Sequence, residues 1–418
     1  MQEGNIKLKT PDGKEEEKKD ENQILEEEKK DENQILEEEK KDENQILEEE
    51  EKKDENKIEE IKEEKGDEDM LGFKEDIFIE VNKEEDLEKI DPDSDRIEIK
   101  ELISPKVIEK LTSIQLKKLE ILSLFKIGIN SIDFLINDNF KSLIILEIKE
   151  KNSIKSLEKI SQVPFNNLKV LDLSSDDISS IEEISKAPFK DLEILILTNN
   201  HIKDIKPITE GPFTKFKKLD ISENEIESID CLGGNTLQNL ESLYLNNNKI
   251  SNISVLKNEV FKSLKELQLA NNQIEKIDDL INAPLAQLEE LILYGNKIVS
   301  IDALSNPKFE KLKILNLSQN HINDIKILSE CHFKKLEILN LFNNEIVNID
   351  ILKKIPFKDI KELDLSFNKI NSVDVLLIEI FDKLKTLNIE GNSLNYGNNN
   401  IKTIYDNYKI KYNYNSIC

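Results

Sequence analysis

Residue types that carry most chemistry are scarce in this chain. Its 418 residues include no tryptophan, three histidines, three cysteines and a single arginine, Arg96. Cys231, Cys331 and Cys418 are odd in number and irregularly spaced. That pattern indicates neither a disulfide framework nor a metal knuckle, and it predicts reduced thiols. The sequence also lacks a phosphate-binding glycine-rich loop, a nucleophile elbow and zinc-ligand spacing. We therefore expect no catalytic, cofactor-binding or metal-binding residues, and a protein that is not an enzyme.

Long apolar runs are also missing. The first fourteen residues have no apolar core of signal-peptide length, and no window resembles a membrane-spanning helix. These absences predict a cytosolic or nuclear protein, and they leave open export by a pathway that does not require a classical signal peptide. With 86 acidic against 59 basic side chains the net charge is −27. This balance argues against binding to a nucleic-acid backbone or to an anionic membrane.

Much of the negative charge lies in a low-complexity tail, residues 1–67, which contains 28 acidic residues and 14 lysines. An eleven-residue unit, KKDENQILEEE, begins at residues 18, 29 and 40 and recurs in degraded form at 52. Eleven residues make three helical turns, so Ile24, Ile35 and Ile46 would share one narrow stripe. One Ile-Leu pair per unit offers little to bury. We predict a disordered or transiently helical tail, with a charged helix and a coiled coil as alternatives.

Residues 68–115 form a transition. Residues 77–81 and 96–100 alternate like short strands, and residues 107–111 fit one helical turn. A repeat array must cover the open end of its core, so we expect this segment to be an N-terminal cap.

From Leu116 to Asn392 the chain repeats. Twelve units begin at 116, 140, 165, 189, 213, 237, 261, 285, 309, 333, 357 and 381, at a spacing of 24 residues with one step of 25. In the unit from Phe309, Leu315 and Leu317 are two residues apart and so point to one face of a strand. Ile325 and Leu328, three apart, suit a short helical return segment. Each unit is therefore predicted to be a strand, a turn and a return, and stacking must build the common core.

An asparagine follows the strand in most units. Where a strand bends sharply, a buried amide can both donate to and accept from inward-pointing backbone groups. We therefore expect a structural asparagine ladder, and Asn296→Ala to cost on the order of 1–3 kcal/mol. The first units depart from it, with Ile127 in this position, Asn152 displaced by the extra residue, and Asp176 substituting. The predicted ladder consists of Asn200, Asn224, Asn248, Asn272, Asn296, Asn320, Asn344, Asn368 and Asn392.

The pattern LxxLxLxxNxIxxI resembles the leucine-rich repeats, especially the short class found in the nuclear phosphatase-1 regulatory subunit and the bacterial internalins. The resemblance covers about 300 residues. It implies an α/β fold, a curved horseshoe-shaped solenoid with a parallel sheet on its concave face, and partner binding on that face. The units are longer than that class usually has, and the added length includes a recurrent phenylalanine.

Function is predicted to lie on the concave sheet. Most side chains that flank the core leucines are small or polar, but several apolar ones gather in units six to ten. We expect these to be exposed and to anchor a protein partner, against the alternative of scattered apolar residues without a role. The candidate residues are Tyr244, Ile292, Tyr294 and Phe342, together with Ile196.

The leading interpretation is a protein-interaction scaffold or adaptor, with no nucleic acid, membrane or cofactor involved. The sequence leaves the oligomeric state open and favours a monomer. Alternatives are a regulatory subunit of an enzyme such as a phosphatase, and an exported internalin-like effector. Residues 393–418 are predicted to be a C-terminal cap. Its alternating Tyr408, Ile410, Tyr412 and Tyr414 indicate a capping strand, or else a partner-binding edge.

Overall fold

The computed structural model describes residues 78–377, 383–394 and 404. The chain divides into two units, Met1–Glu75 and Asp76–Cys418, and the described residues belong to the second. The predictions for the acidic tail and for the alternating tyrosines near the C-terminus lie outside the described residues.

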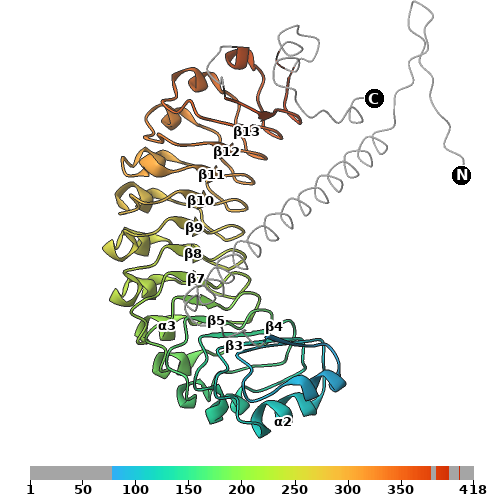
Figure 1. The fold of residues 1–418 in the computed structure, drawn as a ribbon. Helices are drawn as coiled ribbons and strands as arrows, with labels where there is room; N and C mark the ends of the chain where they lie inside the picture. The colour runs from blue at the N-terminus through green and yellow to red at the C-terminus, as the bar shows by residue number, and fades with distance from the viewer. Residues whose placement is uncertain (1–77, 378–382, 395–403, 405–418) are drawn as a thin grey trace, which may run out of the picture. The chain divides into compact units, whose positions relative to one another are not determined.

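The second unit is a stack of parallel strands in which every strand pairs with its sequence neighbours, in one 14-stranded sheet. The strands line the inner side of an arc, and the return segments follow its outer side (Figure 1). This is the leucine-rich-repeat solenoid that the repeat pattern predicts. The strands are β1 (Phe78–Val81), β2 (Arg96–Lys100), β3 (Ile121–Phe125), β4 (Ile145–Lys149), β5 (Val170–Asp172), β6 (Ile194–Ile196), β7 (Lys218–Asp220), β8 (Ser242–Tyr244), β9 (Glu266–Gln268), β10 (Glu290–Ile292), β11 (Ile314–Asn316), β12 (Ile338–Asn340), β13 (Glu362–Asp364) and β14 (Thr386–Asn388).

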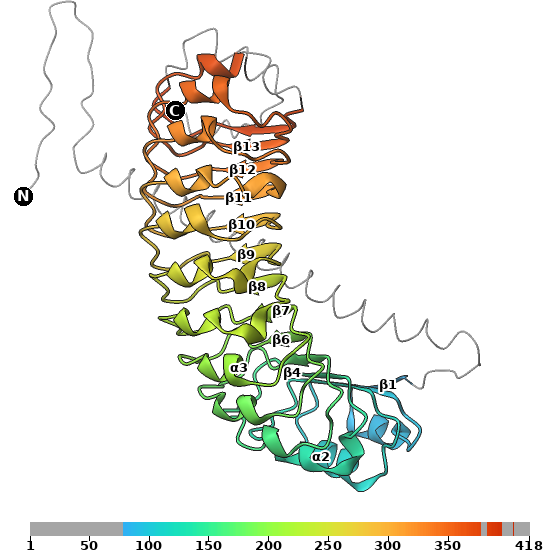
Figure 2. The same cartoon turned by 90° about the vertical axis from the view of Figure 1, so that its left-hand side faces the viewer.

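The return segments are short helices stacked on the outer side (Figure 2). Most are 3₁₀ turns, because a few residues must cross from one strand to the next without a full α-helical repeat. Among the described residues the α-helices are α2 (Pro105–Ser113) and α3 (Lys206–Glu210). The 3₁₀ helices are η1 (Glu84–Lys89), η2 (Asp133–Ile136), η3 (Asp138–Phe140), η4 (Ile160–Gln162), η5 (Glu182–Lys186), η6 (Asp230–Gly233), η7 (Asn235–Leu237), η8 (Ser254–Lys257), η9 (Glu259–Phe261), η10 (Asp278–Asn282), η11 (Asp302–Ser305), η12 (Phe309–Lys311), η13 (Lys326–Ser329), η14 (Asp350–Lys354) and η15 (Asp374–Leu377).

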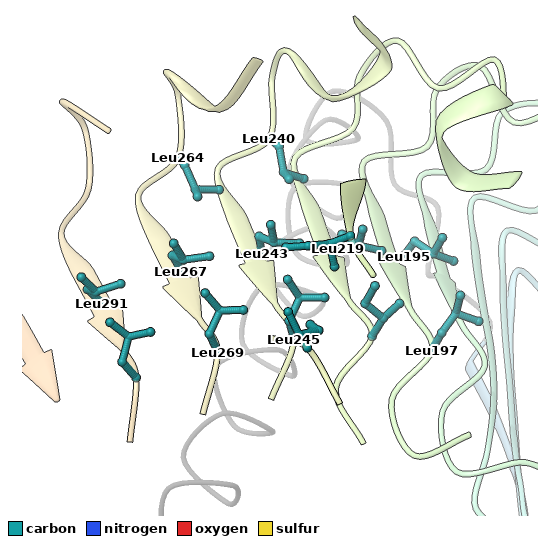
Figure 3. Packing of buried hydrophobic residues seen from close by; sticks show 14 of the residues in the cluster. Leu195, Leu197, Leu219, Leu240, Leu243, Leu245, Leu264, Leu267, Leu269 and Leu291 are labelled. Atoms are coloured by element: carbon teal, nitrogen blue, oxygen red, sulfur yellow. The ribbon is translucent and has the colours of Figure 1, made fainter. Parts of the chain in front are cut away.

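The core is a continuous column of leucines. Leu291 is in register with Leu267 on one side and Leu315 on the other, and the same alignment holds along the array. The leucines of β6–β10 lie one over another in the stack (Figure 3) and are fully buried. Burying a leucine stabilises the fold by roughly 2 kcal/mol, so the stack dominates the stability of each unit. The recurrent phenylalanines extend this core toward the outer side; the rings of Phe165 and Phe189 stack at 5.6 Å.

The segment before the first repeat continues the same sheet. β1 and β2 pair in parallel, and β2 pairs with β3 in the register of the later strands. The helix α2 begins after Ser104, whose hydroxyl accepts a hydrogen bond from the backbone N–H of Lys106, with Pro105 in the first turn. Its Val107 and Leu111 are buried in the core.

Along one lateral edge of the array, charged side chains alternate in sign with a period of two repeat units. The residue two positions before the core leucine alternates between glutamate and lysine over eight consecutive units, and each lysine pairs with the glutamate of the unit before it. The ammonium–carboxylate distances lie between 2.5 and 2.7 Å. The pairs are Glu193–Lys217, Glu241–Lys265, Glu289–Lys313 and Glu337–Lys361.

The turn after each strand places one residue in the left-handed region. From Ser175 to Gly391 the residue before the ladder position has a φ between 50° and 66° in every unit. Glycine occupies this position at Gly295 and Gly391, whereas asparagine, glutamate, glutamine, serine or phenylalanine occupies it elsewhere. The bend that the asparagine ladder follows is therefore a repeated backbone feature.

Gly295→Ala is expected to lower the free energy of unfolding by about 1–2 kcal/mol, since an L side chain is disfavoured at this φ of 66°. An added Cβ would also lie 1.9 Å from Oδ1 of Asn271, whose side chain would have to move. Urea denaturation followed by circular dichroism measures the change. Gly234→Ala is the matched control, because Gly234 has a φ of −75° and a Cβ there meets nothing closer than 3.8 Å. Equal effects of the two substitutions would contradict the expectation.

Candidate functional site

The concave face consists of the strand side chains that point away from the leucine core. Because side chains alternate along a strand, three positions in each unit reach this face: the residue before the first core leucine, the residue between the two leucines, and the residue after the second. In β12 these are Ile338, Asn340 and, just beyond the strand, Phe342.

The buried asparagines follow the strands, and each bonds in the same way. The side-chain nitrogen of Asn200 donates to the carbonyls of Leu197 and Thr198 in its own unit and to that of Leu173 in the unit before. Its Oδ1 accepts from the backbone N–H of Ile178, at 2.9 Å. The same four contacts recur at every position of the predicted ladder through Asn392. Each asparagine therefore joins the backbones of two adjacent units.

The ladder also holds at the irregular unit near the N-terminal end. Glu150 and Lys151 both have positive φ and absorb the extra residue. Oδ1 of Asn152 still accepts from the backbone N–H of Gly128 at 3.1 Å, and its nitrogen donates to the carbonyl of Lys149 at 3.0 Å.

The expectation that the apolar concave residues of units six to ten are exposed is wrong for most of them. Tyr244, Tyr294 and Ile292 are 0%, 3% and 7% exposed, and Ile196 is 4% exposed. Parallel strands in register are about 4.8 Å apart, so large side chains at equivalent positions pack against their lateral neighbours. Of the five predicted anchors, only Phe342 is half-exposed.

Tyr244 lies within a hydrogen-bonded polar cluster on β7–β9. Its hydroxyl donates to Oε2 of Glu266, which also accepts from the hydroxyl of Ser242 at 2.8 Å. The ammonium of Lys218 lies 4.0 Å from the centre of the tyrosine ring. Burial and the neighbouring Glu266 carboxylate raise the pKa of the Tyr244 hydroxyl, so it stays protonated and acts as a donor.

The polar cluster extends to β10. The amide of Asn246 donates to Oε1 of Gln268 at 2.8 Å, and the amide of Gln268 donates to Oε1 of Glu290 at 2.7 Å. Hydrogen-bonded networks of this kind hold side chains in one arrangement. The middle of the concave face is thus a preorganised surface.

The N-terminal part of the concave face combines acids with lysines. Lys149 lies 3.5 Å from a carboxylate oxygen of Glu147 and 3.3 Å from one of Asp172. Burial raises the pKa of the Asp172 carboxyl, an effect that Lys149 opposes. The ring of Phe125 lies between two ammonium groups, those of Lys100 at 5.6 Å and Lys149 at 5.3 Å.

The C-terminal part carries an aromatic pair. Phe342 follows β12, Phe367 follows β13, and their rings meet edge to face with 5.4 Å between centres. Both side chains are half-exposed. Phe367 is absent from the sequence-based candidates because it occupies the left-handed turn position, with a φ of 51°. The signal was available in the repeat alignment, where the other units have small or polar residues at this position.

A hollow of about 470 Å³ borders Phe367 at the rim of the concave face. Gly391 forms part of its wall, and an added Cβ there would lie 2.7 Å from the ring of Phe367. Two basic side chains at this hollow, His321 and Lys369, both face Glu345, at 3.5 and 2.9 Å. The Lys369 ammonium, more than His321, lowers the pKa of the Glu345 carboxyl.

The histidines and cysteines do not assemble a reactive site within the described ranges. His201 and His321 occupy the same register, and each lies 3.5 Å from a surface glutamate. Burial raises the pKa of the Cys331 thiol to about 12, which suppresses the reactive thiolate. No group of His, Cys, Asp or Glu among the described residues could hold a metal ion. In the same part of the chain, no helix has the length and apolarity needed to cross a membrane.

Comparison with known proteins assigns the repeats to a class. A family model described as leucine-rich repeat matches residues 211–298, and a second one matches residues 310–325 and 358–378. An internalin from Listeria monocytogenes is similar at a TM-score of 0.53 with 24% identity, over 69% of this chain and 84% of its own. A leucine-rich-repeat protein from Leptospira interrogans is similar at a TM-score of 0.56 with 21% identity, over 77% of this chain and 90% of its own.

A third similar structure is the ectodomain of a plant membrane receptor kinase from Arabidopsis thaliana, solved in complex with Casparian strip integrity factor 2. Its TM-score is 0.51 with 22% identity, over 72% of this chain and 38% of its own. No curated protein sequence matches the chain. At these identities the similarity establishes the fold.

Proposed function

Because this chain is a leucine-rich-repeat protein, we propose that it binds a partner protein on its concave face and acts as a scaffold or adaptor. One observation carries the proposal: the half-exposed aromatic pair, Phe342 and Phe367, on the C-terminal part of that face. Aromatic side chains surrounded by polar groups are typical anchors of protein interfaces. The neighbouring strands present asparagine, serine and carboxylate side chains, which suit a polar rim.

The rigidity of the surface supports the same function. The asparagine ladder and the hydrogen-bonded cluster on β7–β10 fix the sheet before any partner arrives. A preorganised surface loses less conformational entropy on binding and so binds more tightly for its area. The plant receptor of similar fold was solved with a bound factor, which agrees with binding as a use of this architecture.

The test is affinity purification from the source cells with the wild-type chain and a Phe342→Ser, Phe367→Asn variant. These substitutions introduce residues that the chain uses at the same positions in other units, such as Ser318 and Asn343, so the variant is expected to fold. We expect a partner recovered by the wild type to fall at least about tenfold with the variant, as for loss of interface anchors.

The matched control is Ile281→Ala, Val299→Ala. Both side chains are exposed apolar residues outside the concave positions, at 38% and 49% exposure. The control should recover the partner as well as the wild type does. Equal recovery by the wild type and the Phe342, Phe367 variant, at matched melting temperature, would refute the proposed site.

A further inference from the structure

We propose that the C-terminal part of the concave face, around Phe342 and Phe367, binds a segment of the partner through an arginine side chain. This inference rests on the proposed function and specifies the chemistry of its partner. Three features of the described residues support it: the distribution of charge on the concave face, the use of aromatic rings there, and the hollow beside Phe367.

Charge on the concave face is segregated along the array. The cations at concave positions all lie on β2–β7, and they are Arg96, Lys100, Lys149 and Lys218. The concave positions of β9–β14 hold no lysine, arginine or histidine. They carry five carboxylates, Glu266, Glu290, Glu362, Asp364 and Glu390. A concave wall lined by one sign of charge concentrates its field and attracts the opposite sign.

Aromatic rings accompany the concave cations. Arg96 lies 4.7 Å from the ring centre of Phe78, and Lys218 lies 4.0 Å from that of Tyr244. Lys100 and Lys149 both lie against Phe125. Each concave cation of β2–β7 therefore contacts the face of a ring, an arrangement that stabilises the charge electrostatically.

The Phe342–Phe367 pair has no such cation within the described part of the chain. It stands where the concave positions are acidic, with Asp364 on the strand before Phe367 and Glu390 following the next strand. The backbone N–H of Phe367 donates to the carbonyl of Glu390 at 2.8 Å, which places the two residues side by side. Asp364 accepts hydrogen bonds from Ser366 and Asn388, and both acidic residues are half-exposed, like the two rings. Half-exposed rings on an acidic stretch of the face complement a cation supplied from outside.

An arginine fits this surface better than a lysine. A guanidinium can stack its plane on an aromatic ring while its N–H groups donate to carboxylates, whereas an ammonium is a compact, strongly hydrated charge. The hollow beside Phe367 has room for a long side chain, at about 470 Å³. The basic side chains in its lining, His321 and Lys369, both face Glu345.

The experiment measures binding of the full chain, at physiological salt, to a short fluorescent peptide with three arginines and to its twin with citrulline. Citrulline keeps the shape and removes the charge. We expect the arginine peptide to bind at least about fivefold more tightly, and Phe342→Leu or Phe367→Leu to reduce that preference about two- to threefold. Leucine retains apolar volume but has no ring.

A second pair of variants separates local from general electrostatic attraction, because a chain of net charge −27 attracts any cationic peptide. Glu390→Gln should weaken the arginine peptide several-fold, whereas Glu259→Gln, an equal charge change on the exposed return segment η9, should not. Equal binding of the arginine and citrulline peptides would overturn the inference. It would also be overturned if the two glutamine variants weakened binding equally and the leucine variants had no effect. If a partner is nevertheless captured and lost with Phe342→Ser, Phe367→Asn, the proposed function stands and only the arginine assignment fails.

Discussion

Asn296→Ala is expected to lower the free energy of unfolding by about 3 kcal/mol, because it leaves several buried backbone groups without partners, each at a cost of roughly 1–3 kcal/mol. The Asn296 nitrogen donates to the carbonyls of Leu269, Leu293 and Tyr294 at 2.9, 3.0 and 3.2 Å. Its Oδ1 accepts from the N–H of Ile274 at 3.0 Å. Asn296 is only 6% exposed, so water replaces few of these bonds.

The measurement combines urea denaturation with hydrogen exchange at the Ile274 amide. A repeat array can open locally, so the exchange of that amide reports the damaged junction even where the global transition is complex. Asn323→Ala is the control, since Asn323 is an exposed asparagine three residues after the next ladder position. It should change stability by less than about 0.5 kcal/mol. Unchanged protection of Ile274 in Asn296→Ala would contradict a structural role for the ladder.

The sequence predicted the solenoid because its determinants are local and repeated. Leu315 and Leu317 point to one face whatever surrounds them, since the alternation of a strand is a property of the backbone. A period of 24 residues then places every leucine in register with the next, and β3–β14 follow the predicted units. The two strands before the first repeat were predicted in the same way, from alternation alone.

Exposure on the concave face could not be predicted in this way. Whether Tyr244 is accessible depends on Lys218 and Glu266, which approach it only when the neighbouring units stack. The alternation of side chains along a strand shows which face of the sheet a side chain lies on, but not how closely the side chains of adjacent strands pack against it. The candidate residues therefore lie on the concave face as predicted, but all of them except Phe342 are buried and not exposed.

Phe367 was overlooked for a conformational reason. The left-handed region disfavours bulky residues, so a phenylalanine is not expected in the turn that asparagine and glycine occupy in other units. The alternation of glutamate and lysine from Glu193 to Lys361 was readable from the same alignment, because ion pairs between adjacent units follow directly from the period.

Asp176→Asn is expected to stabilise the protein at pH 8 by about 2–4 kcal/mol. Asp176 occupies a ladder position and is 6% exposed, and within the described ranges neither of its carboxyl oxygens has a hydrogen bond of good geometry. The backbone N–H groups of Ile154 and Asn152 face the carboxyl and oppose the rise of its pKa. Burial, with a smaller effect from the neighbouring Asp177, raises the pKa of the Asp176 carboxyl to about 7. Each pKa unit corresponds to about 1.4 kcal/mol, so a charge buried at alkaline pH carries a cost of this size.

The sign of the pH dependence follows from the raised pKa. Below the ordinary value of 3.8 the carboxyl is protonated in the folded and unfolded chains alike, and no charge penalty exists. As pH rises toward 7 the unfolded chain releases the proton first, so the stability of the wild type falls relative to that of the variant. The gap between them should be small at pH 4, grow between pH 4 and 7, and level off above pH 8.

Thermal and urea denaturation of both proteins across this range measure the gap, and titrations common to both cancel in the difference. Glu227→Gln is the control, because Glu227 is exposed and lies in another unit, so its replacement should change stability little at any pH. A gap of equal size at pH 4 and pH 8 would mean that the amide acts through its hydrogen bonds alone. A pH-dependent gap would show that the ladder requires a neutral side chain, and that this junction weakens as the Asp176 carboxyl loses its proton.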